Sequence, residues 1–147
     1  MAEFIIRKEE DMSWTSEFNP ELGIIETIFS VEMTGVEVRE VTSFLISLGR
    51  KTGTTKFLVD ASEIILVASI FDLYSLPAGQ YVDEGADRSS CVALVIPRDE
   101  KAIEAFRFYE TACRNRCWNV RLFQERQSAV NWLLGKTGSS KPDAGDG

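Results

Sequence analysis

The chain has 147 residues, of which 44% are apolar and 27% charged, with 10 glycines and 4 prolines. These values suit one globular domain with a sizeable core and exclude collagen-like and wholly disordered chains. The longest apolar runs, such as residues 64–68, are too short to span a bilayer, and no long apolar stretch follows the charges near the N-terminus. We therefore expect neither a membrane span nor a signal peptide.

The net charge is −7, and the acidic excess lies in residues 1–97, which hold 7 basic and 16 acidic side chains. Such a surface repels phosphate backbones, so we expect no nucleic-acid partner. Histidine is absent, which removes histidine-based acid–base and metal chemistry. Cys91, Cys113 and Cys117 are odd in number and lack the CxxC spacing. We therefore expect packed, reduced thiols, a cytoplasmic location and no cofactor.

Hydrophobic periodicity divides the chain into alternating strands and helices. In chain order it predicts strands at 3–7, 13–18 and 24–33, a helix from 34 that Gly49 and residues 50–53 close, a strand at 56–61, a helix from 69, a strand at 91–96, a helix over 99–116, a strand at 119–124 and a helix over 128–134. This order predicts an α/β fold with a mixed, mostly parallel central sheet of about five strands and four main helices. Residues 1–135 are expected to form this single domain, followed by a disordered tail over 136–147.

Local signals mark the starts of two helices. Thr34, with Glu37 three residues further on, forms a capping-box pattern, and Ser69 with Asp72 has the composition of a second N-cap. Pro77 either kinks the helix that Ser69 opens or begins a new turn. The second helix is therefore expected to be irregular.

Several segments occur in an order that is familiar from a known superfamily. They are SIFDLYSLP (69–77), DRS (87–89), VALVIP (92–97), FYETACRNR (108–116), VRLF (120–123) and AVNWL (129–133). Together they resemble the SpoIIAA-like superfamily, which has the fold of STAS (sulfate transporter and anti-sigma-factor antagonist) domains. Within it, the chain is most similar to a small bacterial group that is also likened to CRAL-TRIO lipid-binding domains. The resemblance covers residues 3–134 and includes no invariant catalytic motif.

The resemblance implies a small cytoplasmic module that binds or regulates and does not catalyse. STAS domains often switch partners by phosphorylation within an Asp-Ser-Ser-Gly motif, in whose place this chain has Ala68, Ser69, Ile70 and Phe71. Ser69 is the phosphorylation candidate, because a phosphate there would meet free N–H groups at a helix start. The favoured alternative is a simple N-cap. Cys117 stands where the resembling proteins usually carry a helix-ending glycine, which predicts local strain.

Charged residues supply further candidate binding sites. Asp60 and Glu63 lie at or just after the carboxyl end of a predicted strand, where α/β sheets gather ligands. They could bind a cation or act in acid–base chemistry, or they could simply cap the loop. Arg114, Arg116 and Arg121 could bind a phosphate or an acidic partner, while arginines in the last turn of a helix also stabilise its negative end.

Two functions follow from these observations. The first is a regulatory or protein-interaction module without catalytic activity, acting as a homodimer or with another protein. The alternative is a carrier that holds a lipid or another small apolar molecule in a pocket between helices and sheet. Residues 64–67, Phe71 and Tyr74 are the candidates to line such a pocket, although they could equally fill the core or a dimer interface.

Overall fold

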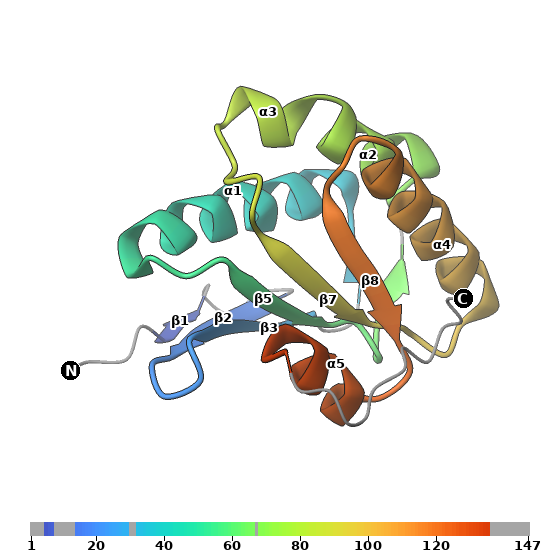
Figure 1. Ribbon diagram of the computed structural model, residues 1–147. Coiled ribbons are helices and arrows are strands. Elements are labelled where there is room, and N and C mark those ends of the chain that lie inside the picture. Colours follow the sequence, from blue (N-terminus) through green and yellow to red (C-terminus); the bar gives the residue numbers. More distant parts are fainter. Residues whose placement is uncertain (1–4, 8–13, 30–31, 67, 136–147) are drawn as a thin grey trace.

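The computed structural model describes residues 5–7, 14–29, 32–66 and 68–135. Its elements alternate as the sequence predicts, and the α/β class is confirmed (Figure 1). The strands are β1 (Ile5–Arg7), β2 (Trp14–Asn19), β3 (Ile24–Phe29), β4 (Glu32–Met33), β5 (Lys56–Asp60), β6 (Ile65–Leu66), β7 (Cys91–Val95) and β8 (Asn119–Phe123). The helices are α1 (Gly35–Thr52), α2 (Ile70–Ser75), a π-helical turn (Leu76–Gln80), α3 (Tyr81–Asp83), α4 (Glu100–Asn115) and α5 (Arg126–Leu133). In these described ranges, no helix combines the length and apolar character needed to cross a membrane.

Within the described residues, six strands form one mixed sheet in the order β1-β2-β3-β5-β7-β8. The pairings β1-β2 and β2-β3 are antiparallel, whereas β3-β5, β5-β7 and β7-β8 are parallel. The sheet is therefore mostly parallel as predicted, with one strand more than the five expected. Residues near the ends of β3, β5, β7 and β8 pair across the sheet in register, namely Ile28, Asp60, Val95 and Phe123. This register brings the carboxyl ends of the four strands to one edge of the sheet.

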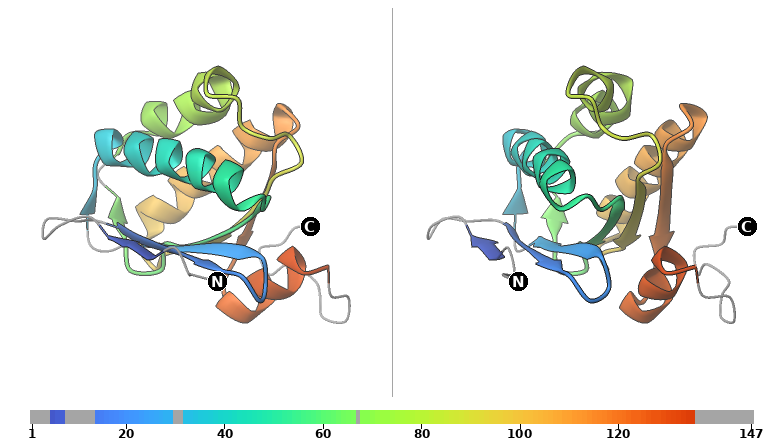
Figure 2. Two further views of the ribbon diagram at one scale, coloured as in Figure 1. Left: turned by 90° about the vertical axis from the view of Figure 1, so that its left-hand side faces the viewer. Right: turned by 60° about the vertical axis from the view of Figure 1, so that its left-hand side comes forward.

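Helices cover both faces of the sheet (Figure 2). α1 and α4 lie over one face, with α2 and α3 stacked above them and farther from the sheet, while α5 covers the opposite face. α2 contacts both α1 and α4, so it closes the space between those two helices. Arg126 at the start of α5 donates two hydrogen bonds of 2.8 Å to the Glu26 carboxylate on β3. This pair fixes α5 against its side of the sheet.

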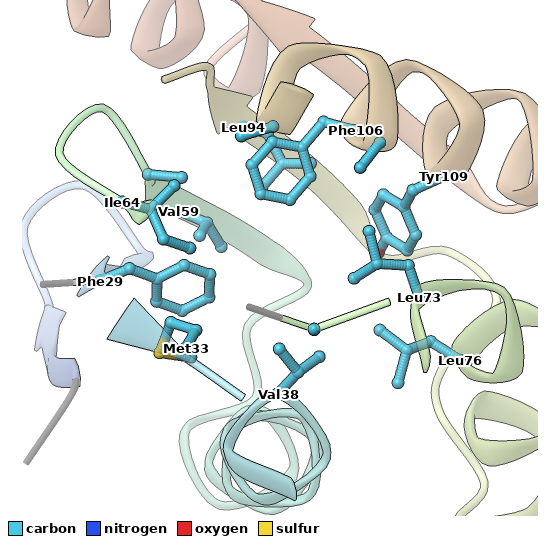
Figure 3. Packing of buried hydrophobic residues seen from close by; sticks show 14 of the residues in the cluster. Phe29, Met33, Val38, Val59, Ile64, Leu73, Leu76, Leu94, Phe106 and Tyr109 are labelled. Atoms are coloured by element: carbon cyan, nitrogen blue, oxygen red, sulfur yellow. The ribbon is translucent and has the colours of Figure 1, made fainter. Parts of the chain in front are cut away.

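The largest hydrophobic cluster lies between the sheet and the helices on the α1 and α4 side. Figure 3 shows Val59 and Leu94 of the sheet beside Phe106 of α4, with Leu73 of α2 on the far side of the same cluster. Successive residues of a strand point to opposite faces. Leu58, next to Val59, accordingly packs in the second cluster beneath α5.

The predicted signals at both ends of α1 are present. The Thr34 hydroxyl accepts the Glu37 N–H at 3.2 Å, and the Glu37 carboxylate accepts the Thr34 N–H at 2.9 Å, which completes the capping box. α1 ends within the predicted stretch 49–53, at Gly53, whose φ of 77° is the left-handed conformation that favours glycine. Gly49 lies inside the helix as a packing position. A Cβ there would lie 2.9 Å from the Phe57 ring.

Three further segments differ in detail from the prediction. The predicted strand 24–33 is divided into β3 and β4, and β4 pairs in parallel with β6 in a separate small sheet. The connection 62–68, for which no strand was predicted, contains β6. Pro77 lies in the π-helical turn between α2 and α3, in agreement with the expected irregularity. The tail predicted over 136–147 lies outside the described residues.

Candidate functional site

Ser69 is the N-cap of α2, as expected. Its hydroxyl accepts the Asp72 N–H at 3.1 Å, and the Asp72 carboxylate accepts the Ser69 N–H at 2.9 Å. The bond from the Ser69 N–H, helped by the Arg39 guanidinium 3.1 Å away, lowers the pKa of Asp72 below its ordinary value. A phosphate on Ser69 would face this ionised carboxylate and be repelled by it. The cap accounts for Ser69, and its phosphorylation stays a prediction.

Asp60 and Glu63 occupy the turn after β5. Asp60 Oδ1 accepts hydrogen bonds from the Ser62 N–H at 3.0 Å and from the Ser62 hydroxyl at 2.7 Å. Asp60 therefore caps the loop, which was one of the roles expected for it. Glu63 is exposed. Across the part of the chain that the structure describes, no three side chains of metal-ligating type come together. The Asp60 carboxylate therefore stabilises this turn, and a role of Asp60 and Glu63 in binding stays a prediction.

Four large apolar side chains are exposed together on α2 and α4. Phe71 is 82% exposed, Ile70 48%, Phe108 40% and Tyr74 37%. Ile70 and Phe71 lie one helical turn before Tyr74, so the three side chains share the outer side of α2. The Tyr74 ring centroid lies 6.2 Å from that of Phe108 on α4. We call these four residues the aromatic surface.

Arg116 connects the aromatic surface to the end of α4. Its guanidinium carbon lies 4.8 Å from the centroid of the Tyr74 ring, and its Nη2 donates a 2.6 Å hydrogen bond to the Tyr74 hydroxyl. Arg114 lies 3.9 Å from the Glu110 carboxylate of the same helix. The structure thus gathers Phe71, Tyr74 and Arg116, three of the residues that the sequence marked for partner binding.

Phe108 belongs to the aromatic surface but was missed at the sequence level. It lies on the polar side of α4, where Glu104 and Thr111, one turn before and after it, are also exposed. A large apolar residue on the polar side of an amphipathic helix is the signal that could have identified it.

A second feature is a cavity of about 560 Å³ between the sheet and the helices. It reaches from the interior to the amino ends of β5, β7 and β8, the edge opposite to the one predicted for ligands. Phe71 and Tyr74, which were candidates to line such a pocket or a dimer interface, do not line this cavity and lie on the surface. Ile64 is buried in the core and Ile65 is exposed, while Val67 lies outside the described residues.

No family model matches the chain, and no curated protein matches it. Among solved structures, it is similar to an uncharacterized protein of the DUF3478 family from Shewanella loihica PV-4, described as having a SpoIIAA-like fold. The two chains are 18% identical, with a TM-score of 0.49 over 90% of this chain and 92% of the other. That description names the same type of fold that the sequence resembles.

Proposed function

We propose that this chain is a protein-interaction module whose aromatic surface binds an acidic segment of another protein. The exposure of Phe71 carries the proposal, because a side chain that is 82% exposed adds almost nothing to the core. Clustered exposed aromatic residues on soluble proteins often mark interaction sites. α2 is held by its other side, where Leu73 is buried, so its outer side is available to a partner.

Charge supports an acidic occupant. Arg107 precedes Phe108 on α4, Arg114 lies two turns further along the same side of the helix, and Arg116 follows at its end. Arginine binds carboxylates through two parallel hydrogen bonds and is enriched at protein interfaces. A segment that combines Asp or Glu with an apolar anchor would complement both the arginines and the aromatic surface.

A second copy of the chain fits this surface less well. In a twofold dimer, the same patch of both subunits would meet, and the arginines at the end of α4 would approach those of the other subunit. Like charges placed opposite each other across an interface weaken the binding free energy by several kcal/mol. The homodimer is therefore an outcome for the experiment to detect, and another protein is the proposed occupant.

The same proposal includes a cytoplasmic location and no catalytic step. Cys91, Cys113 and Cys117 are all unpaired, which suits a reducing compartment. The absence of histidine from the sequence supports a binding role that requires no cofactor.

The experiment is selection of binders from a random peptide library displayed against the purified chain. We expect the selected peptides to be rich in Asp and Glu around one apolar residue. Affinities are then measured for Phe71→Ser and for the matched control Val82→Ser, which removes an apolar side chain of 56% exposure from α3. Truncating an aromatic anchor costs about 2 kcal/mol or more. Phe71→Ser should therefore weaken binding by roughly 30-fold, and Val82→Ser should leave it unchanged.

Both variants should fold normally, because substitutions at exposed positions change stability by about 0.5 kcal/mol or less. Circular dichroism and thermal unfolding check this point. Selected peptides without acidic residues, or equal affinities for Phe71→Ser and Val82→Ser, would contradict the proposal. A dimer in sedimentation that Phe71→Ser converts to a monomer would show that a second copy is the occupant.

A further inference from the structure

We propose that the cavity between α1, α4 and the sheet binds a neutral, apolar small molecule. This site is separate from the aromatic surface and does not depend on the proposed interaction with a protein. Pockets that bind small molecules commonly have volumes of about 300–1,000 Å³, and the 560 Å³ cavity lies within that range.

The walls of the cavity are mostly apolar. Phe57 and Val92 line it from the sheet, and Leu45 and Phe106 line it from the inner sides of α1 and α4. Leu73 of α2 and Ala86, which follows α3, line it as well. Leu45, Val92 and Ala86 are only partly buried even though they pack against the core cluster. Apolar surface that remains open inside the molecule favours an apolar occupant, because filling the cavity removes that surface from water.

Two tyrosine hydroxyls of the wall are neutral and bonded to each other. The Tyr81 and Tyr109 hydroxyls form a hydrogen bond, and burial raises the pKa of each phenol. Burial also raises the pKa of the neighbouring Cys113 thiol to about 12, so it too is uncharged at neutral pH. A charged group placed in this interior would meet no opposite charge among these three side chains. Burying an unpaired charge is costly, so the inner part of the ligand must be neutral.

The mouth of the cavity also favours a neutral ligand. Arg50 and Asp87 carry the two formal charges among the lining residues in the described part of the chain, and these charges balance. Arg50 Nη2 donates to the carbonyl oxygens of Glu84 and Gly85, and the Asp87 carboxylate accepts the Ser89 N–H at 2.9 Å. Both charged groups therefore already bind the protein itself.

Hydroxyl and amide groups complete the mouth. Thr55, Ser90 and Asn119 line it at the amino ends of β5, β7 and β8. Such groups can donate or accept a hydrogen bond without a charged partner. A ligand with an apolar body and one hydroxyl or carbonyl group at its outer end fits this distribution.

Decanol and decanoate test the proposal, because they share an alkyl chain and differ in the charge of the head group. The measurement is the unfolding temperature of the full chain at increasing concentrations of each probe, below the concentration at which the probe aggregates. A ligand that binds the folded state raises this temperature as its concentration rises. We expect decanol to bind at least tenfold more tightly than decanoate.

Two variants locate the binding site. Ala86→Phe places a ring in the mouth of the cavity, and Ala78→Phe adds the same ring at an exposed position outside the lining. We expect Ala86→Phe to weaken decanol binding at least tenfold and Ala78→Phe to leave it unchanged. Ile46→Trp fills the cavity from α1 and provides a second test if Ala86→Phe does not fold.

Three results would overturn the proposal. The first is no effect of decanol on the wild-type chain. The second is unchanged binding in a folded Ala86→Phe or Ile46→Trp variant, which would place the probe elsewhere. The third is decanoate binding as tightly as decanol, which would refute the requirement for a neutral ligand. None of these results bears on Phe71, so the proposed protein interaction stands or fails by its own experiment.

Discussion

Replacing Cys117 with glycine should stabilise the protein. Cys117 has a φ of 68°, the one positive value among the non-glycine residues that the structure describes. It follows the Arg116 C-cap of α4 in a Schellman motif, in which the Trp118 N–H donates to the Cys113 carbonyl at 2.9 Å and the Cys117 N–H donates to the Arg114 carbonyl at 3.0 Å. Glycine is the usual residue at this position, so the strain that the sequence predicts at Cys117 is present in the structure.

The size of the effect follows from two opposing contributions. A residue with a Cβ costs about 1–2 kcal/mol in the left-handed conformation, whereas glycine adopts it freely. Glycine also makes the unfolded chain more flexible, which offsets about 0.4–1 kcal/mol of this gain. We expect Cys117→Gly to raise the free energy of unfolding by roughly 0.5–1 kcal/mol, or the unfolding temperature by about 2–4 °C for a full kcal/mol.

Urea unfolding followed by circular dichroism measures this change. Cys117→Ala is the matched control, because it removes the exposed thiol but keeps the Cβ that causes the strain. Its urea midpoint should equal that of the wild type, while the midpoint of Cys117→Gly should be higher at the same slope. Equal midpoints for the glycine and alanine variants would refute the argument from backbone strain.

Two further outcomes concern the charged cap of α2 and the acid stability of the chain. Ser69→Ala should lower the free energy of unfolding by about 1 kcal/mol, because the Asp72 N–H loses its acceptor. Ser69→Asp should retain most of the cap's contribution to stability, since Asp is also a good N-cap residue. Thermal unfolding of both variants checks this. Hydrogen bonds from Ser69 and Ser89 lower the pKa values of Asp72 and Asp87 in the folded state. The stability that these carboxylates add is present above pH about 4 and is lost as the pH falls through the lowered values. Asp72→Asn should flatten the pH dependence in acid, and an unchanged acid profile would contradict this assignment.

The sequence was a good guide wherever structure depends on short-range signals. The capping boxes of Thr34 and Ser69 predicted the starts of α1 and α2 because a cap involves only residues within one turn. The alternation in residues 24–29 predicted β3, because this pattern also involves only residues that are close in the chain. The packing role of Gly49 could not be predicted in this way, because it depends on the Phe57 ring, which approaches Gly49 from a strand that comes later in the chain.

The candidate sites were harder to predict because they depend on which side of an element becomes buried. α2 has only six residues, and apolar side chains lie around most of its circumference, so periodicity does not separate its inner and outer sides. The role of Phe71 was consequently left open between a pocket, the core and a dimer interface, whereas Leu73 is the residue of α2 that is buried and lines the cavity. The cavity itself is formed between α1, α4 and the sheet, and no local pattern reports the space left between such distant segments.

The position of α2 determines how the two proposed sites can be separated by experiment. Leu73 faces the cavity, whereas Phe71 and Tyr74 lie on the outer surface of the same short helix. If α2 is rigid, Phe71→Ser changes peptide affinity and leaves decanol affinity unchanged, and Ala86→Phe does the reverse. If decanol changes the affinity for the peptide, linkage requires that the peptide change the affinity for decanol by the same factor. A factor different from one would show that the two sites are coupled, and α2 and α4 are the helices that contribute residues to both of them.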